Sequence, residues 1–348
     1  MSLVLISSER FADHQTPPGH PERSERADVM DVVASRWREG GGDVVAPRLV
    51  SREHLARVHD PEHLRRIRET SGQTLALDED TYTSPESHDV ALLAAGAAVD
   101  GVERVMGGGH RAALVLVRPP GHHAERGRAM GFCLYNNAAV AAAHARTLGA
   151  RRVAIVDFDV HHGNGTQHIF EADPHVLYVS VHQGPYYPGT GSVTELGRGP
   201  GRGFTVNIPV EAGAVDADYQ VVFADIVIPV LRQFEPDLVV VSAGFDAHHR
   251  DPLGGMRLTS AAFAAMTAAL RGVAEECCMG RMVVITEGGY DLVALRESLD
   301  GVVDAMRGPV PTAAWGASEA EPTRGRDAVR AARTSLVPFW ALPPVAAP

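Results

Sequence analysis

The sequence contains no lysine, and this absence shapes its charge. All 32 basic residues are arginines, against 43 acidic residues, so the formal net charge is −11. The rich use of alanine, glycine and arginine points to genomic base composition as the reason. Because electrostatic binding of nucleic acid needs an excess of basic charge, we expect no nucleic-acid partner.

Cysteine is scarce as well. The chain has Cys133, Cys277 and Cys278, with one adjacent pair and no C-x-x-C motif. An odd count in this arrangement argues against a disulfide framework and against a cysteine-type zinc site.

Long apolar runs are also missing. No stretch approaches the roughly 20 apolar residues that cross a bilayer. The apolar start at residues 3–6 is too short for a signal peptide and lacks a basic beginning. We therefore expect a cytoplasmic protein with no membrane partner. With 45% hydrophobic and 22% charged residues, the composition is typical of a globular protein.

Short apolar segments alternate with longer helical patterns along the chain. The segments typical of buried strands are 3–7, 44–45, 113–117, 153–156, 176–181, 204–209, 238–242 and 282–286. This alternation predicts an α/β fold: one domain built on an open, mostly parallel sheet with helices on both faces. We place that domain at residues 1–307. Residues 308–348 would form a Pro/Ala-rich connector and a C-terminal helix that docks on the domain.

One helical pattern, residues 51–70, is rich in Arg, Glu and His. Its histidines are His54, His59 and His63, a spacing that does not hold one helical face. We therefore expect a solvated surface element whose histidines bind no ligand.

The stretch 153–166 is the most informative part of the chain. It reads V-A-I-V-D-F-D-V-H-H-G-N-G-T, a buried strand that ends in polar residues. Asp159 and His161 lie two positions apart, so they point to one side of an extended segment. Asp246 follows a later strand, and ligands bind at the carboxyl ends of such strands. Two carboxylates and one imidazole leave an open position on a tetrahedral ion, which suits zinc or ferrous iron.

Other strand ends carry residues suited to proton transfer. His122 and His123 follow a third strand, and adjacent histidines are better suited to moving protons beside a metal than to binding it together. Tyr290 follows a fourth strand and can donate a hydrogen bond to an oxyanion. With a metal-activated water, these groups would make an amide hydrolase. We expect Asp157 to orient His122 and Asn164 to orient His123, although a neutral amide raises basicity less than a carboxylate does.

With these residues in hand, the chain resembles the histone deacetylase family, in the arginase-like deacetylase superfamily. The resemblance runs from about residue 14 to residue 301 and is closest to class II and bacterial deacetylase-like amidohydrolases. The matching motifs are H-P-E-R at 20–23, R-P-P-G-H-H at 118–123, G-F-C at 131–133, D-F-D-V-H-H-G-N-G-T-Q at 157–167, Y-Y-P-G-T-G at 186–191, A-G-F-D at 243–246, D-P-L-G at 251–254 and E-G-G-Y at 287–290.

The resemblance implies a sheet of about eight parallel strands and a catalytic zinc on Asp159, His161 and Asp246. It implies His123 as general base and acid, His122 as its electrostatic partner, and Tyr290 as oxyanion donor. A hydroxamate is expected to inhibit by chelating the ion. Family members also carry structural potassium, which the resemblance assigns to Asp157, Asp159, His161, Ser180 and Val181.

The resemblance further implies a tunnel for an acyl-lysine side chain. Phe132 and Tyr187 match its two aromatic walls, although the family usually has Phe at the second position. Asp80 matches a rim carboxylate that grips the substrate backbone, and Gly131 and Gly289 are expected to line the site. Leu253 is apolar where relatives specific for acetylpolyamines tend to place an acidic residue, which favours acyl-lysine. The acidic cluster at residues 78–80 partly offsets this, because it would attract any cationic substrate.

Several functions are compatible with this pattern. The first is a zinc-dependent deacetylase acting on N-acetyl-lysine side chains of proteins or peptides, and the second acts on acetylpolyamines or other small acyl amides. A non-catalytic binding protein is disfavoured by the complete set of metal and proton-transfer residues. A ureohydrolase would need two manganese ions and further carboxylate ligands, which D-V-H-H-G lacks. Acyl length and oligomeric state are not set by these residues.

Overall fold

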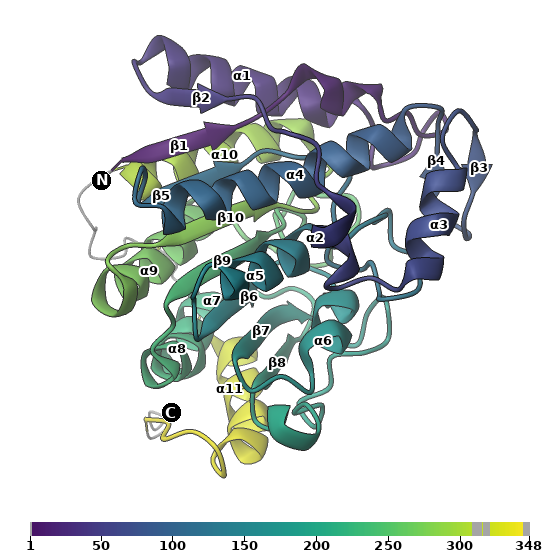
Figure 1. The fold of residues 1–348 in the computed structure, drawn as a ribbon. Coiled ribbons are helices and arrows are strands. Elements are labelled where there is room, and N and C mark those ends of the chain that lie inside the picture. The colour runs from purple at the N-terminus through teal and green to yellow at the C-terminus, as the bar shows by residue number, and fades with distance from the viewer. Residues whose placement is uncertain (1, 308–314, 316–320, 344–348) are drawn as a thin grey trace.

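The computed structural model describes residues 2–307, 315 and 321–343 (Figure 1). Within them, eight strands form one open sheet in the order β2-β1-β5-β10-β9-β6-β7-β8, and every neighbouring pair is parallel. The strands are β1 (Leu3–Ile6), β2 (Asp43–Val45), β5 (Ala112–Val115), β6 (Val153–Asp157), β7 (Val176–Gln183), β8 (Thr205–Val210), β9 (Leu238–Ala243) and β10 (Met282–Thr286). A small antiparallel pair, β3 (Leu75–Ala76) and β4 (Tyr82–Thr83), lies apart from this sheet.

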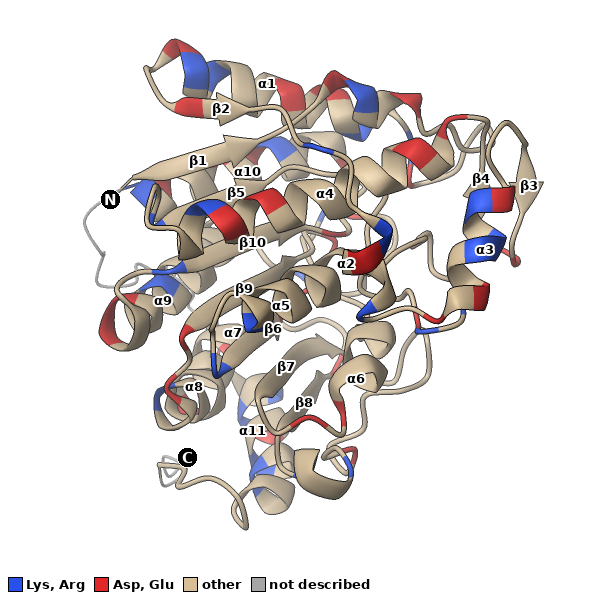
Figure 2. Cartoon of the chain, in the orientation of Figure 1, with Lys and Arg blue, Asp and Glu red and all other residues tan. Residues whose placement is uncertain are grey.

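The sheet separates two hydrophobic cores. In β1, Leu3 and Leu5 belong to one core while Val4 and Ile6 belong to the other. Successive side chains of a strand point to opposite faces, so a strand covered on both faces must be apolar throughout. This is why the buried strands appear in the sequence as continuous Val, Ile and Leu runs. Charged residues lie mainly on the helices and loops (Figure 2).

Helices cover both faces of the sheet (Figure 1). One layer contains α2 (Arg52–Ala56), α3 (Pro61–Glu69), α4 (Ser87–Met106), α5 (Asn137–Thr147) and α6 (Asn164–Phe170). The other contains α1 (Glu25–Glu39), α7 (Asp216–Val222), α8 (Ile228–Phe234), α9 (Ser260–Cys278), α10 (Leu292–Arg307) and α11 (Thr323–Leu336). The predicted α/β fold, an open parallel sheet between helices, is therefore confirmed.

A π-helical turn interrupts one helical segment. Within residues 216–234, the turn at Phe223–Val227 separates α7 from α8. Pro229 follows at the start of α8. Proline has no N–H and clashes with the preceding turn, and a wider turn accommodates this.

The expectation for residues 51–70 was correct for most of the charged side chains, which are exposed, and wrong for two of the histidines. The segment breaks at Asp60 and Pro61 into α2 and α3, and the side chains of His59 and His63 are buried rather than solvated. His59 Nδ1 bonds the carbonyl of Glu125, and His63 Nε2 bonds the carbonyl of Leu134 at 2.9 Å. These histidines satisfy backbone groups of buried loops, which a polar side chain with an apolar body can do.

The C-terminal helix packs on the domain. α11 lies beside α7 and β8, and Leu336 and Trp340 are buried. Trp340 Nε1 donates to the carbonyl of Gly203 at 2.9 Å. Val337 and Phe339 remain exposed. Most of the predicted connector lies outside the described residues, so the division of the chain at residue 307 stays a prediction.

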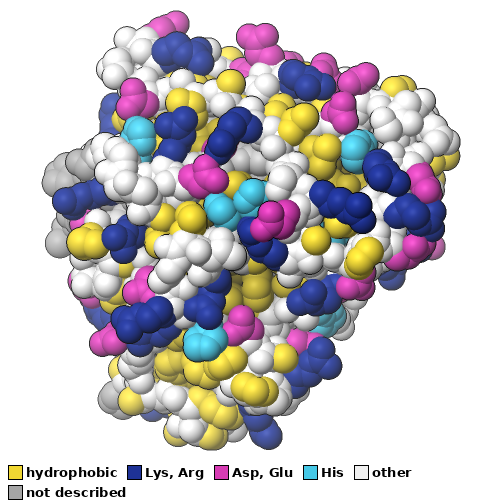
Figure 3. Space-filling view, viewed as in Figure 1, with side chains coloured by type: hydrophobic (Ala, Val, Ile, Leu, Met, Phe, Trp, Pro, Cys, Tyr) yellow, Lys and Arg dark blue, Asp and Glu magenta, His cyan; other side chains and the backbone are white. Residues whose placement is uncertain are grey.

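The surface in Figure 3 carries arginine and acidic side chains intermingled, without a broad basic area on that face. Among the helices of the described residues, none is long and apolar enough to cross a bilayer. The cytoplasmic location and the lack of a nucleic-acid partner stay predictions.

Candidate active site

The three predicted metal ligands come together at the carboxyl end of the sheet. Asp159 and His161 follow β6, and Asp246 follows β9, the neighbour of β6. His161 Nδ1 lies 3.2 Å from Asp159 Oδ1 and 3.2 Å from Asp246 Oδ2. All three side chains are buried. Two residues after one strand and one residue after its neighbour thus converge on one point.

Glycine at position 288 allows this convergence. Its backbone N–H donates to Asp159 Oδ2 at 2.9 Å. A Cβ atom at this position would lie 2.2 Å from Asp246 Oδ2 and 2.7 Å from Asp159 Oδ2. Any larger residue would displace the two carboxylates, so the loop after β10 requires glycine here.

The charges of this cluster call for a cation. Burial and the neighbouring Asp159 raise the pKa of Asp246 to about 7. Burial opposes a charge on His161, yet hydrogen bonding and attraction to Asp159 and Asp246 raise its pKa to about 9. Apart from the ion-pair contact with His161, Asp246 Oδ2 has no hydrogen-bond partner among the described residues. A carboxylate oxygen with so little compensation beside a second carboxylate is costly in a dry site. Two carboxylate oxygens and an imidazole nitrogen fit a divalent ion such as zinc.

The two adjacent histidines lie beside this cluster with different partners. His122 Nδ1 donates to Asp157 Oδ2 at 3.0 Å, and His123 Nδ1 donates to Asn164 Oδ1 at 2.7 Å. Burial lowers the pKa of His122, but Asp159 and Asp157 outweigh it and raise the pKa to about 10. Burial and the charge of His122 hold the pKa of His123 well below its usual range. At neutral pH the pair therefore consists of a charged His122 and a neutral His123.

Asn164 also contacts Glu125, a residue that was not predicted from the sequence. Asn164 Nδ2 donates to Glu125 Oε1 at 2.5 Å, and His168 Nδ1 donates to the same oxygen at 2.8 Å. Glu125 thus places a carboxylate behind the neutral amide. Two spacings in the sequence could have indicated these contacts. Glu125 lies two residues after His123, and His168 lies four residues after Asn164, on the same side of α6.

A buried ionic cluster holds the loop that carries Tyr290, and it too was missed. Glu22 accepts hydrogen bonds from Arg26 and from Arg118, and all three side chains are buried. Arg26 Nε donates to the carbonyl of Gly289 at 2.8 Å, and its guanidinium lies 5.2 Å from the Tyr290 ring centroid. Glu22 of the H-P-E-R motif therefore holds Arg26 of α1, and Arg26 in turn holds the E-G-G-Y loop.

Tyr290 is itself buried. Its backbone N–H donates to Asp251 Oδ2 at 2.6 Å. Burial and the nearby Asp246 raise the pKa of the Tyr290 phenol well above its usual range. The hydroxyl therefore stays protonated and able to donate a hydrogen bond.

Aromatic side chains surround the mouth of the site. Phe132 meets Tyr290 edge-on with ring centroids 5.8 Å apart, and Tyr187 meets His123 edge-on at 5.2 Å. Gly131 has a positive φ of 56°, and a Cβ there would lie 2.5 Å from His123. The structure also places Tyr186, which was not singled out in the sequence, stacked on His161 at 5.4 Å.

The remaining predicted residues lie at the rim or behind the site. Thr81 Oγ1 donates to Asp80 Oδ1 at 3.1 Å and accepts from the backbone N–H of Phe132 at 3.1 Å, so Asp80 lies one residue from the Phe132 loop contact. Leu253 and Tyr290 line one surface groove of about 620 Å³. Ser180 is the cross-strand partner of Asp157, and its Oγ bonds His182 Nδ1 at 2.9 Å. The binding of potassium there stays a prediction, as do the roles of Gly289 and Val181.

Comparison with known proteins agrees with this geometry. A family profile described as the histone deacetylase domain matches residues 20–306. The chain belongs to the histone deacetylase family. Among curated proteins, the chain is 41% identical to Histone deacetylase 15 of Arabidopsis thaliana. It is 39% identical to a probable deacetylase of Archaeoglobus fulgidus, and each match covers 88% of this chain.

A further relative is the human Polyamine deacetylase HDAC10, 38% identical over 98% of this deacetylase-family chain. The chain spans 56% of the plant relative, 53% of the human one and 87% of the archaeal one. The solved structure of the HD domain of HDA15 superposes with a TM-score of 0.89 at 37% identity, covering 98% of this chain and 97% of that one. These matches confirm the family and the fold that the motifs indicated.

Proposed function

We propose that this protein is a zinc-dependent amide hydrolase that removes acetyl groups from N-acetyl-lysine side chains of proteins or peptides. One observation carries the proposal: the convergence of Asp159, His161 and Asp246 beside a neutral His123 at the end of an aromatic-lined opening. A metal triad alone would fit many functions. A triad beside a base, an oxyanion donor and aromatic walls fits amide hydrolysis.

Asp159, His161 and Asp246 would hold the ion. When bound, zinc would polarise the acyl carbonyl and lower the pKa of a water molecule. His123, with Nδ1 engaged by Asn164, would take a proton at Nε2 from the attacking water and return it to the leaving amine. Charged His122 sets the local field, and the Tyr290 hydroxyl donates to the acyl oxygen as negative charge develops on it. Water oxygen bonds to the acyl carbon, the C–N bond breaks, and acetate and a free amine leave.

The aromatic walls support an acyl-lysine as the substrate. Phe132 lies beside Tyr290, Tyr187 lies beside His123, and apolar Leu253 lies at the neighbouring groove. The two aromatic rings would contact the methylene chain of a lysine side chain. Asp80 at the rim is suited to accept hydrogen bonds from the backbone amides of a peptide.

Small acetylpolyamines are the second candidate. The acidic residues Asp78 and Asp80 would attract a cationic substrate, and the relative named Polyamine deacetylase HDAC10 matches nearly the whole chain. A comparison of kcat/KM for an acetyl-lysine peptide, N-acetylputrescine and acetylspermidine on zinc-loaded protein separates the two. We expect the peptide to be preferred, and a clear preference for the polyamines would replace the first proposal with the second.

A further inference from the structure

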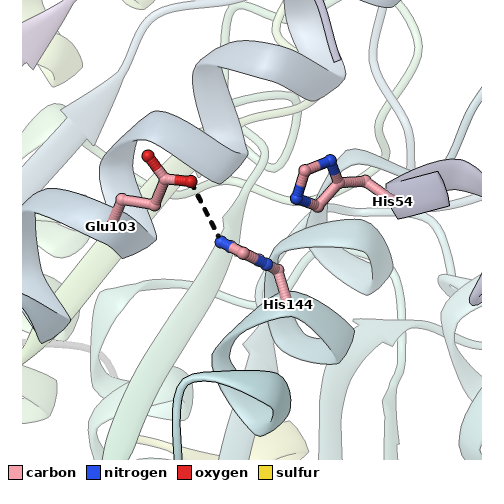
Figure 4. A group of neighbouring side chains, drawn as sticks. All are labelled: His54, Glu103 and His144. Carbon is pink, nitrogen blue, oxygen red and sulfur yellow. Dashed lines mark hydrogen bonds and ion pairs between the residues drawn. The ribbon is translucent and has the colours of Figure 1, made fainter. Parts of the chain in front are cut away.

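A second group of metal-binding side chains lies on the helical layer outside the active site. His54 comes from α2, Glu103 from α4 and His144 from α5, and the three side chains face one another (Figure 4). One potential ligand atom from each lies within 4.8 Å of the others. His144 Nε2 is 3.3 Å from Glu103 Oε1, and the two imidazole rings meet edge-on with centroids 4.6 Å apart.

Each histidine is held through one nitrogen, which leaves the other for an ion. His54 Nδ1 bonds Ser51 Oγ at 2.6 Å, and Ser51 is the N-cap of α2. His144 Nδ1 lies 3.3 Å from Thr147 Oγ1. A metal-binding imidazole usually has its second nitrogen fixed by an oxygen in this way. Among the described residues, His54 Nε2 has no hydrogen bond, and His144 Nε2 contacts only the carboxylate of the group.

The guanidinium groups next to the three side chains are paired with carboxylates. Arg48 pairs with Asp100 and with Glu103 Oε2, and Arg57 pairs with Glu53 at 2.8 Å. Three carboxylates therefore offset two guanidinium groups, and Glu103 Oε1 remains available.

We propose that His54, Glu103 and His144 form a second metal site, which takes a divalent first-row transition ion such as Zn²⁺ and joins α2, α4 and α5. Two imidazole nitrogens and one carboxylate oxygen are zinc ligands, with water in the fourth position. Ligand atoms about 2.0–2.2 Å from a tetrahedral ion lie about 3.3 Å apart, so the group must draw together slightly. Partly exposed His54 can move by that amount. Arg57 Nη1, now 3.2 Å from His144 Nδ1, would give up that contact and keep Glu53.

This site is independent of the catalytic residues. His144 lies seven residues along α5 from Asn137, whose side chain bonds the carbonyl of Pro119 near the active site. Seven residues of helix span about 10 Å. Replacing His54 or His144 should therefore leave deacetylation unchanged.

The test counts ions on protein that has been stripped by chelation and reloaded with Zn²⁺. We expect two ions per wild-type chain, and one in His54→Gln and in His144→Gln. The exposed His175→Gln variant, a matched control, should keep two. Should His144→Gln fail to fold, His54→Gln on the partly exposed α2 gives the result alone. One ion in the wild type, or two ions in both histidine variants, would overturn the proposal.

A second measurement fixes the position of the extra ion. Asp246→Ala should lose the catalytic ion and keep the one on His54, Glu103 and His144. With Co²⁺ in place of zinc, the visible absorption that remains in Asp246→Ala should disappear when His54→Gln is added. Loss of both ions in Asp246→Ala alone would instead place them together at the catalytic centre and contradict a separate site.

Discussion

At the scale of single residues, the contact between Asn164 and Glu125 explains how a neutral amide can serve as the partner of His123. An amide polarises His123 less than a carboxylate would, but Glu125, which also bonds His168, places a carboxylate one hydrogen bond further away. We therefore expect Glu125 to act as a positioning residue on His123, the proposed proton-transfer histidine, through Asn164. Residues behind an active histidine typically influence activity by about 10- to 100-fold.

Glu125→Gln should lower kcat by about 10-fold with little change in KM, because substrate contacts are untouched while the orientation and basicity of His123 decline. The measurement is steady-state kinetics over a pH range, in which the acidic limb should also shift. Glu297→Gln, an exposed carboxyl on α10, is the matched control. Equal kcat and equal pH profiles in the two variants would remove Glu125 from this role.

Tyr290 makes a different contribution. Tyr290→Phe should lower kcat by about 100- to 1,000-fold, the usual effect of losing one oxyanion donor. Zinc content should stay at the wild-type value, because Tyr290 is not in the metal cluster. Metal analysis alongside kinetics checks both points, and unimpaired turnover would show that the phenol takes no part.

At the scale of elements, α1 and the loop after β10 behave as one unit. Glu22 precedes α1, and its carboxylate is shared by Arg26 and Arg118 in a fully buried cluster. Through Arg26 this cluster reaches the carbonyls of Glu287 and Gly289. The rigidity of the Tyr290 loop therefore depends on a segment more than 250 residues earlier in the chain.

Glu22→Gln should lower the free energy of unfolding by about 3–5 kcal/mol, since it leaves two buried guanidinium groups without their counter-charge. Burial alone would raise the pKa of Glu22, but Arg118, His14 and Arg26 hold it well below 4.5. The unfolded chain therefore takes up this proton first, and the stabilisation is complete above about pH 4.5 and is lost as the pH falls through the folded-state pKa. Denaturant unfolding at several pH values should show a steeper acid loss in wild type than in Glu22→Gln. Parallel curves would contradict the assignment.

At the scale of the whole molecule, the parts that could be predicted are those that local patterns encode. Parallel strands buried on both faces appear as β-branched runs, and the D-x-H spacing after β6 placed two ligands on one side. The predictions failed for residues whose burial or contacts depend on how distant segments pack together. His63 shares the buried face of α3 with Ile67, four residues on, and a polar segment does not show which face will be covered. Glu125 and Arg26 act through contacts between loops and helices far apart in sequence, which no local spacing records.

The same limit applies to the substrate. The metal cluster and its proton-transfer pair follow from motifs at strand ends, whereas the rim is built from Asp80, Tyr187 and Leu253 on separate loops. The family relatives include both proteins named histone deacetylases and one named a polyamine deacetylase. The preference for one substrate class therefore depends on how these loops come together in the folded protein, and it must be measured.

In the proposed mechanism, deacetylation depends on an ion held by Asp159, His161 and Asp246. The most direct measurement is acetate release from an acetyl-lysine peptide by chelated protein to which Zn²⁺ is added back, with Asp246→Ala in parallel. We expect turnover to be absent after chelation, to return with zinc in the wild type, and to stay absent in the variant. Full turnover in the chelated protein, or zinc-restored turnover in Asp246→Ala, would contradict the claim.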